Sequence, residues 1–218
     1  NRQSWTANAT MLVHPSSLYV GMRTPKYFVP AGQPMRVEVL VTDIDGKRVA
    51  GVPVQIRAQR DRWEYHRGKL RRIEGSAKTC TLTSAPDNPP ACDLQLDEGG
   101  SYTITAEIAD VAGRKNFTRI TRYVEGGELP VVREVDRERV NLVADKAEYR
   151  PGETARVFVQ APFYPAQGIW FLRHAGMDSP HPFTMTGPTT VLEIPLAQAH
   201  MPIAEVQVEI TGAALRVD

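Results

Sequence analysis

The sequence predicts an all-β protein made of two tandem immunoglobulin-like antiparallel β-sandwich domains. The main reason is a pattern that occurs twice: residues 27–41 and 149–161 each run from a tyrosine through a glycine, Gly32 or Gly152, into apolar residues that alternate with polar ones. Glycine supplies the positive φ that many turns need, and an alternation of period two is typical of a strand with one buried face. A chain of 218 residues has room for two sandwiches of about 100 residues each.

Further alternating runs predict the other strands of the first module. The expected strands cover residues 18–20, 35–41, 52–58, 102–108 and 116–124. We expect the second and third of these to form a hairpin across a tight turn that contains Gly46, because glycine tolerates the positive φ of such turns. A second turn is expected around Gly113.

The second module is predicted in the same way. Its expected strands cover residues 140–143, 155–161, 169–171, 192–196 and 206–210. We place the first domain at 1–126 with a short N-terminal extension, a linker at 127–138, and the second domain at 139–218, of which the C-terminal part could be truncated. The linker is short, so we expect the two modules to touch and to cover apolar residues at the junction. Leu129, Val131 and Val132 are the residues expected there.

Composition excludes some functional classes. Lysine and arginine total 26 against 25 aspartates and glutamates, so the net charge gives no reason to expect nucleic acid or an anionic membrane as a partner. No apolar stretch approaches the ~18 residues of a transmembrane helix. The chain begins at Asn1 without a methionine or a signal-like leader, so we expect it to be a fragment of a longer protein.

The two cysteines, Cys80 and Cys92, are predicted to form a structural disulfide. We expect a hairpin with a proline-rich tip to bring them together, and a bond that closes such a loop would contribute about 3 kcal/mol. The alternative is a pair of buried free thiols in a cytosolic protein. Zinc is disfavoured because a tetrahedral site needs four ligands, and no second pair of ligands lies nearby in the sequence. The disulfide in turn predicts a periplasmic or extracellular location.

The tightest cluster of chemically active residue types lies at 174–181 and is the best candidate for an enzymatic site. His174, Asp178, Ser179 and His181 are the residue types of a hydrolytic triad. However, triad members normally converge from separate elements, and the Gly-x-Ser-x-Gly turn that presents a nucleophile is missing. The spacing of the two histidines also fits no strong metal-ligand motif. We therefore interpret the segment as a polar hairpin loop, and predict no catalytic, metal or cofactor-binding residues.

Residues 60–72 combine six arginines or lysines with Trp63 and Tyr65. Basic and aromatic residues interleaved in this way occur in nucleic-acid-binding proteins. The alternative is a long exposed hairpin whose aromatic residues pack on a sheet while its arginines face water. We favour the hairpin because the rest of the chain is not basic, and note that such a segment could also be open to trypsin-like proteases.

Residues 145–163 resemble a macroglobulin-domain signature of the bacterial α2-macroglobulin family. The resemblance lies in an Asp-Lys pair at 145–146, Tyr149, the Pro-Gly-Glu that ends at Glu153, and an Ala-Pro-Phe at 161–163. The first module is similar to the domain that precedes it in that family. It shares Trp63, the cysteine pair, and the segments 99–102 and 110–114, so the resemblance covers nearly the whole chain.

The resemblance implies a fragment of a large extracytoplasmic protease trap, placed just before and at the part of the chain that carries the bait. In this family, cleavage of the bait triggers a rearrangement, and many members then bind the protease covalently through a thioester formed in a Cys-Gly-Glu-Gln sequence. Thr81 follows Cys80 and Asp93 follows Cys92, so a thioester or a lipid-anchoring cysteine would have to lie outside these residues. The implied partners are neighbouring domains of the same chain and, through the full-length protein, target proteases. The alternative is a tandem adhesion or carbohydrate-binding module of a surface protein.

Overall fold

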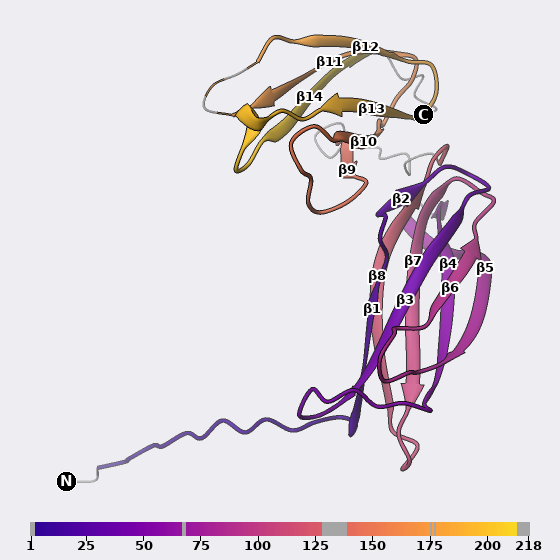
Figure 1. Cartoon of the computed structure of the whole chain (residues 1–218), viewed down its shortest axis with the longest axis vertical. Coiled ribbons are helices and arrows are strands. Elements are labelled where there is room, and N and C mark those ends of the chain that lie inside the picture. The colour runs from indigo at the N-terminus through magenta and orange to yellow at the C-terminus, as the bar shows by residue number, and fades with distance from the viewer. Residues whose placement is uncertain (1–2, 67–68, 128–138, 175, 177, 213–218) are drawn as a thin grey trace.

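The computed structural model describes residues 3–66, 69–127, 139–174, 176 and 178–212, without the side chains of residues 63–66, 69, 70 and 74. Over these residues the protein is all-β, with one short 3-10 turn at Gln198–His200. The predicted fold class is therefore confirmed. Figure 1 shows two sandwiches, with the second at the end of the first that lies away from the N-terminus.

The first sandwich consists of two sheets that face each other. Its strands are β1 (Leu18–Arg23), β2 (Phe28–Val29), β3 (Pro34–Asp43), β4 (Pro53–His66), β5 (Lys69–Thr83), β6 (Ala91–Gln95), β7 (Gly100–Ala109) and β8 (Lys115–Val124). One sheet has the order β1-β3-β6 and the other β2-β8-β7-β4-β5. All pairings are antiparallel except that of β2 with β8. The alternating residues of β3, β4 and β7, among them Val37, Ile56 and Ile104, form the buried core between the sheets.

The second sandwich contains the remaining strands. They are β9 (Asn141–Ala144), β10 (Thr154–Gln160), β11 (Ala166–Arg173), β12 (His181–Met185), β13 (Thr189–Pro195) and β14 (Glu205–Gly212). They form sheets of order β13-β10-β9 and β12-β11-β14. Val157, Val159 and Ile194 meet Leu172 and Met185 in a core that shares no residue with the core of the first sandwich.

The repeated turn has the same geometry in both sandwiches. Gly32 and Gly152 have φ angles of 77° and 89°, which confirms the positive φ predicted for Gly152. In each copy the residue after the glycine donates its backbone N–H to the carbonyl three residues earlier, over 3.1 Å. Each glycine N–H also donates to a leucine carbonyl that follows a core strand, that of Leu96 or Leu196. The sequence repeat is therefore a structural repeat.

The predicted hairpin between the strands at 35–41 and 52–58 is wrong. β3 pairs with β1 and β6, whereas β4 lies in the other sheet between β5 and β7. The chain crosses between the sheets after the Gly46 turn, and the Ser84 side chain fixes this crossing through hydrogen bonds to Val49 and Val52. Alternation identifies a strand with one buried face, but it does not identify the neighbouring strand.

The Cys80–Cys92 disulfide is present, but not within a hairpin. Cys80 lies opposite Ile56 in the five-stranded sheet, and Cys92 lies opposite Val37 in the three-stranded sheet. Both strands are edge strands, so the bond joins the two sheets along one side of the sandwich. The proline-rich segment between the cysteines carries the chain from one sheet to the other.

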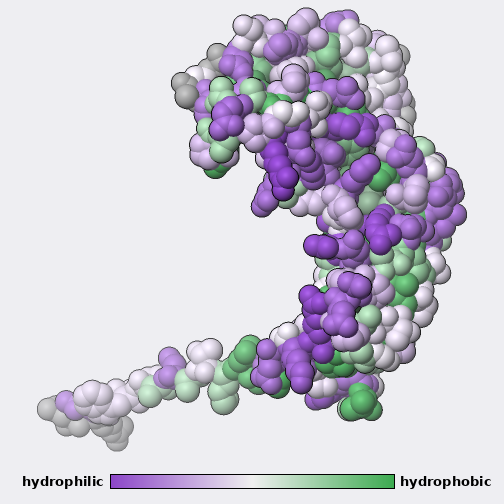
Figure 2. All heavy atoms as spheres, in the orientation of Figure 1, coloured by the Kyte–Doolittle hydropathy of each residue, from purple (hydrophilic) through white to green (hydrophobic). Residues whose placement is uncertain are grey.

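Outside the two cores, the N-terminal residues trail away from the first sandwich (Figure 2), and Trp5, Met11 and Leu12 are exposed. None of the described helices is long and apolar enough to cross a membrane.

Candidate functional site

The two sandwiches meet at a buried cluster of aromatic rings. Phe28 of β2 and Phe158 of β10 are each only 1% exposed, although neither belongs to the core of its own sandwich. The centroids of their rings are 5.5 Å apart, and Tyr123 of β8 adds a third ring 5.9 Å from Phe158. Tilted rings at these distances interact favourably beyond the area that they bury. These three residues form a separate apolar cluster, which we call the junction core.

The alternation of β10 explains why Phe158 points to the first sandwich. Ala155, Val157 and Val159 face the core of the second sandwich, so the residues between them point out of the opposite face. On a sheet with no covering layer, side chains at these positions would be exposed to solvent. Here Phe158 and Gln160 are both buried, because the first sandwich covers this face.

Arg156, on the same face of β10, links charge and aromatic contacts at the junction. Its guanidinium lies 5.5 Å from the centroid of the Phe28 ring and 3.4 Å from the Glu125 carboxylate. Both charged side chains keep about a third of their surface exposed, at 34% for Arg156 and 27% for Glu125. A partly exposed ion pair of this kind contributes little stability, on the order of 1 kcal/mol or less. Its main effect is to orient the arginine over the ring.

Backbone contacts fix the chain where it leaves the first sandwich. The Gln160 side-chain amide donates to the Gly127 carbonyl over 2.6 Å, and the Gly126 N–H donates to the Thr189 hydroxyl over 2.9 Å. A Cβ on Gly127 would lie 2.1 Å from the Gly100 Cα, so this position has no room for a side chain. The start of the segment between the sandwiches is therefore held on both sides.

The motif at 145–153 forms the opposite side of the junction. The Tyr27 N–H donates to the Asp145 carbonyl over 2.8 Å, a backbone hydrogen bond between the two sandwiches. The Tyr149 hydroxyl donates to the Asp145 carboxylate over 2.5 Å, and that carboxylate also accepts a hydrogen bond from the backbone N–H of Arg156. Burial, reinforced by the Asp145 carboxylate, raises the pKa of Tyr149 to about 12, so the hydroxyl keeps its proton and remains a donor.

The loop that carries the motif is closed by one glutamate. The Glu153 carboxylate accepts hydrogen bonds from the Lys146 ammonium over 2.8 Å and from the Arg150 N–H over 2.7 Å. These bonds, that of Lys146 first, hold the pKa of Glu153 below its usual value. The Lys146 ammonium also lies 4.8 Å from the centroid of the Tyr149 ring. Together these contacts fix the turn that presents the Asp145 carbonyl to Tyr27.

Sequence reasoning missed the residues of the junction core. Leu129, Val131 and Val132, which were expected at the junction, lie outside the described residues. A signal was nevertheless present in the sequence, because Phe158 interrupts the alternation between Val157 and Val159. A large apolar residue on the outward face of a strand indicates that something covers that face.

The structure does not assemble a triad from the histidine segment. His174 contacts the Ile203 carbonyl at 3.2 Å, and His181, at the start of β12, stacks on Trp170 with 4.1 Å between ring centroids. Asp178 lies 3.7 Å from His200, and no hydrogen bond within the described residues joins Ser179 to a histidine. The described residues also contain no group of histidine, cysteine, aspartate or glutamate side chains that could hold a metal ion. β11 and β12 pair as an antiparallel hairpin, in agreement with the predicted hairpin loop, except that His181, the last residue assigned to the loop, begins β12.

The basic segment at 60–72 forms the long hairpin of β4 and β5, as the sequence favoured. Its arginines do not all face water. Arg60 donates to the Gly99 carbonyl over 2.7 and 2.9 Å and pairs with Glu98, and Arg72 pairs with Asp61. The side chains of Trp63 and Tyr65 lie outside the described part of the chain.

No family model matches the chain. Among curated proteins, the chain is 26% identical over 174 residues to an alpha-2-macroglobulin homolog of Nostoc sp.. The aligned region covers 77% of this chain, which spans only 9% of the relative. The chain is related to the bacterial α2-macroglobulins. The resemblance inferred from the motif at residues 145–163 is therefore confirmed.

Solved structures of α2-macroglobulins are also similar to the chain. The native conformation of the E. coli protein matches with 17% identity and a TM-score of 0.38, over 90% of this chain and 15% of that one. A Salmonella α2-macroglobulin mutant matches with 17% identity and a TM-score of 0.37, over 89% and 15% of the two chains. Invasin, a bacterial integrin-binding protein, has 18% identity and a TM-score of 0.35, over 89% and 37%. Because these scores are low, the relationship to α2-macroglobulins rests on the Nostoc relative.

Proposed function

We propose that the chain is a structural fragment of a bacterial α2-macroglobulin-like protease inhibitor, which traps attacking proteases after they cleave its bait. The observation that carries this proposal is the relationship to the Nostoc α2-macroglobulin homolog. The motif at 145–153 supports it, because the residues that carry the resemblance are the ones that build one side of the junction.

Within such a protein, the fragment would act mechanically. The proposed domains are 1–126 and 139–218, joined by a linker at 127–138. The junction core, the Tyr27–Asp145 hydrogen bond and the fixed Gly127 would hold the two sandwiches at one angle. A conformational change that starts at a cleaved bait could then pass through the pair as a rigid-body motion. Its partners would be the neighbouring domains and, through the whole protein, target proteases.

The proposal includes the absence of catalysis in this fragment and a periplasmic or extracellular location. A disulfide that joins the two sheets fits an oxidising compartment. The function of the family is inhibition, and the thioester sequence that many members use is absent from the chain. The alternative function is an adhesion module, which no contact among the described residues favours.

The test uses the full-length protein that contains this chain. It is incubated with trypsin-like and elastase-like proteases, and the cleavage sites and the retained protease are identified by mass spectrometry. We expect cleavage in one exposed segment, followed by compaction of the inhibitor and loss of activity of the trapped protease toward large substrates. Cleavage at many sites without retention of the protease would contradict the proposal. If the full-length sequence around this chain instead contained cell-wall anchoring signals, that finding would favour the adhesion function.

A further inference from the structure

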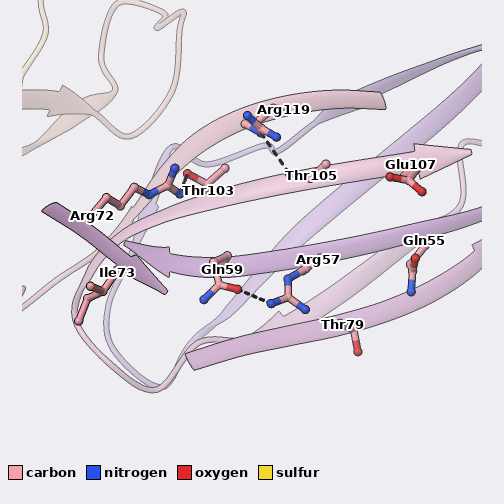
Figure 3. A pocket seen from close by; sticks show the side chains of 10 residues that line it. All are labelled: Gln55, Arg57, Gln59, Arg72, Ile73, Thr79, Thr103, Thr105, Glu107 and Arg119. Atoms are coloured by element: carbon pink, nitrogen blue, oxygen red, sulfur yellow. Dashed lines mark hydrogen bonds between the residues drawn. The ribbon is translucent and has the colours of Figure 1, made fainter. Parts of the chain in front are cut away.

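The outer face of the five-stranded sheet contains a polar hollow that is unconnected with the junction. Its volume is about 540 Å³, and its lining includes Arg57, Arg72, Arg119, Thr103, Thr105 and Glu107 (Figure 3). We propose that this hollow binds an acidic polypeptide segment in an extended conformation.

The register of the sheet aligns the basic groups. Arg57 of β4 lies opposite Thr79 of β5 on one side and Thr105 of β7 on the other, and Thr105 lies opposite Arg119 of β8. One row across four strands therefore reads threonine, arginine, threonine, arginine. Neighbouring strands are about 4.8 Å apart, so the Cα atoms of the two arginines lie roughly 10 Å from each other, with the Thr105 hydroxyl between their side chains.

A third arginine is fixed at the end of the hollow. The pairing of β4 with β5 is irregular between Gln59 and Asp61, as at a β-bulge, where a side chain is commonly re-aimed. The Asp61 carboxylate accepts hydrogen bonds from the hydroxyls of Thr103 (3.0 Å) and Ser101 (3.3 Å), and its side chain is only 10% exposed. Arg72 pairs with this carboxylate and also donates to Thr103 over 2.9 Å. The arginine is thereby held over β7 before any ligand arrives.

The charge of the hollow is complementary to carboxylates. Its lining has three arginines and one glutamate. Glu107 pairs with Lys115 over 2.7 Å and Arg72 pairs with Asp61, so Arg57, which donates to the Gln59 side chain over 2.5 Å, and Arg119 supply the attraction for a carboxylate. Among the described contacts, Arg119 makes one side-chain hydrogen bond, a long one of 3.4 Å to Thr105, and its guanidinium, which has five N–H donors, lies 5.4 Å from the centroid of the Phe117 ring. Arginine is suited to carboxylates because its planar fork can donate two parallel hydrogen bonds.

Geometry favours a polypeptide over the other polyanions. In an extended peptide, acidic side chains two residues apart lie on one face and are separated by roughly 7 Å, a spacing that two long arginine side chains starting roughly 10 Å apart can meet. Among the side chains that the structure describes, the lining includes no aromatic ring, and Ile73 is its one apolar residue; Phe117 lies at the edge, with its ring centroid 5.4 Å from the Arg119 guanidinium. The net charge of +1 also makes a nucleic acid an unsuitable partner.

The test measures binding of a fluorescent oligoglutamate peptide to the 218-residue chain by anisotropy, at low and physiological salt. The variant is Arg57→Glu/Arg119→Glu, whose side chains lie on the outer face of the sheet and make no contact with the core. The matched control is Lys26→Glu/Lys47→Glu, which changes the net charge equally at exposed positions away from the hollow. Circular dichroism checks that each variant is folded. Oligolysine, a sulfated oligosaccharide and inorganic phosphate serve as competing probes.

We expect the oligoglutamate peptide to bind, and the Arg57/Arg119 variant to bind at least about tenfold more weakly than the control variant. Equal weakening in both variants would show non-specific attraction and overturn the proposal. Failure of the peptide to bind at low salt would overturn it too. Tighter binding of the sulfated oligosaccharide than of the peptide, lost in the same variant, would reassign the hollow to a carbohydrate and so contradict the proposed ligand.

Discussion

Replacing Phe158 by alanine should uncouple the two sandwiches while leaving each one folded. Phe158 is almost fully buried, yet it packs against Phe28 and Tyr123 of the first sandwich rather than into its own core. Burial of a phenylalanine side chain contributes about 1.5–3 kcal/mol, and each aromatic pair adds about 0.5–1.5 kcal/mol. The free energy that couples the sandwiches should therefore fall by roughly 2–4 kcal/mol, since part of each contribution survives in the alanine variant.

Two measurements follow this change. In urea, we expect the wild-type chain to unfold in one transition and the variant in two, followed by tryptophan fluorescence, to which Trp170 contributes the signal of the second sandwich and Trp63 that of the first. Small-angle scattering should show a larger radius of gyration for the variant, because the angle between the sandwiches is no longer fixed. Phe28→Ala, in the first sandwich, should have the same effect, and the double variant should lose little more coupling free energy than either single variant.

The matched control is Phe117→Ala on β8. This change removes the same ring, but Phe117 is 56% exposed on the outer face of the first sandwich and takes no part in the junction core. It should leave the scattering profile and the number of transitions unchanged. If Phe158→Ala behaved like this control, the junction core would not be what couples the sandwiches, and the mechanical proposal would fail.

Gly152→Val should destabilise the second sandwich by at least about 1–2 kcal/mol in urea titrations, because φ is 89° there, whereas Gly187→Val, at an open position without positive φ, should not. Gly127→Ala should open the junction in small-angle scattering, since the new Cβ would meet the Gly100 backbone; an unchanged profile would refute this. Replacing both Cys80 and Cys92 by alanine should lower the stability of the first sandwich by about 2–4 kcal/mol, and alkylation of the unreduced wild-type chain should find no free thiol. Hydrogen bonds, of which that from the Ser17 backbone N–H has the largest effect, hold the pKa of the Asp110 carboxyl well below its usual value. The ionised carboxylate therefore stabilises the fold above about pH 4, and this stabilisation is lost as the pH falls further. In thermal melts, Asp110→Asn should not show this loss of stability at low pH.

The strands could be predicted because alternation is a local property. Val37, Ile104 and Val157 each lie in a run with a period of two, and each faces a core as expected. The pairing of strands is not local. The sequence around Gly46 looks like a hairpin turn, and Gly46 does have the expected positive φ, but the chain then crosses to the other sheet instead of returning beside β3.

The junction was predicted as a contact but not as a set of residues. Short linkers bring neighbouring domains together, so a covered apolar surface was expected, and the apolar residues of the linker were the nearest candidates. The surface instead comes from Phe28, Tyr123 and Phe158, which are far apart in the sequence. Only the interruption of the alternation at Phe158 signals it locally. Similarly, the segment that ends at His181 was predicted as a polar hairpin loop; β11 and β12 do pair as a hairpin, but His181 already belongs to β12, where it stacks on Trp170.

The relation between the repeat and the junction suggests why two similar modules assemble in one fixed way. Both copies build the same glycine turn, so the turn itself does not distinguish them. The second copy adds an aspartate and a lysine before its tyrosine, and these close the loop through Tyr149 and Glu153. The carbonyl of that aspartate accepts the N–H of Tyr27, which is the tyrosine of the first copy. The side chains in which the copies differ thus close the loop that holds the Asp145 carbonyl against Tyr27, so a difference between the two copies accompanies the contact between the two sandwiches.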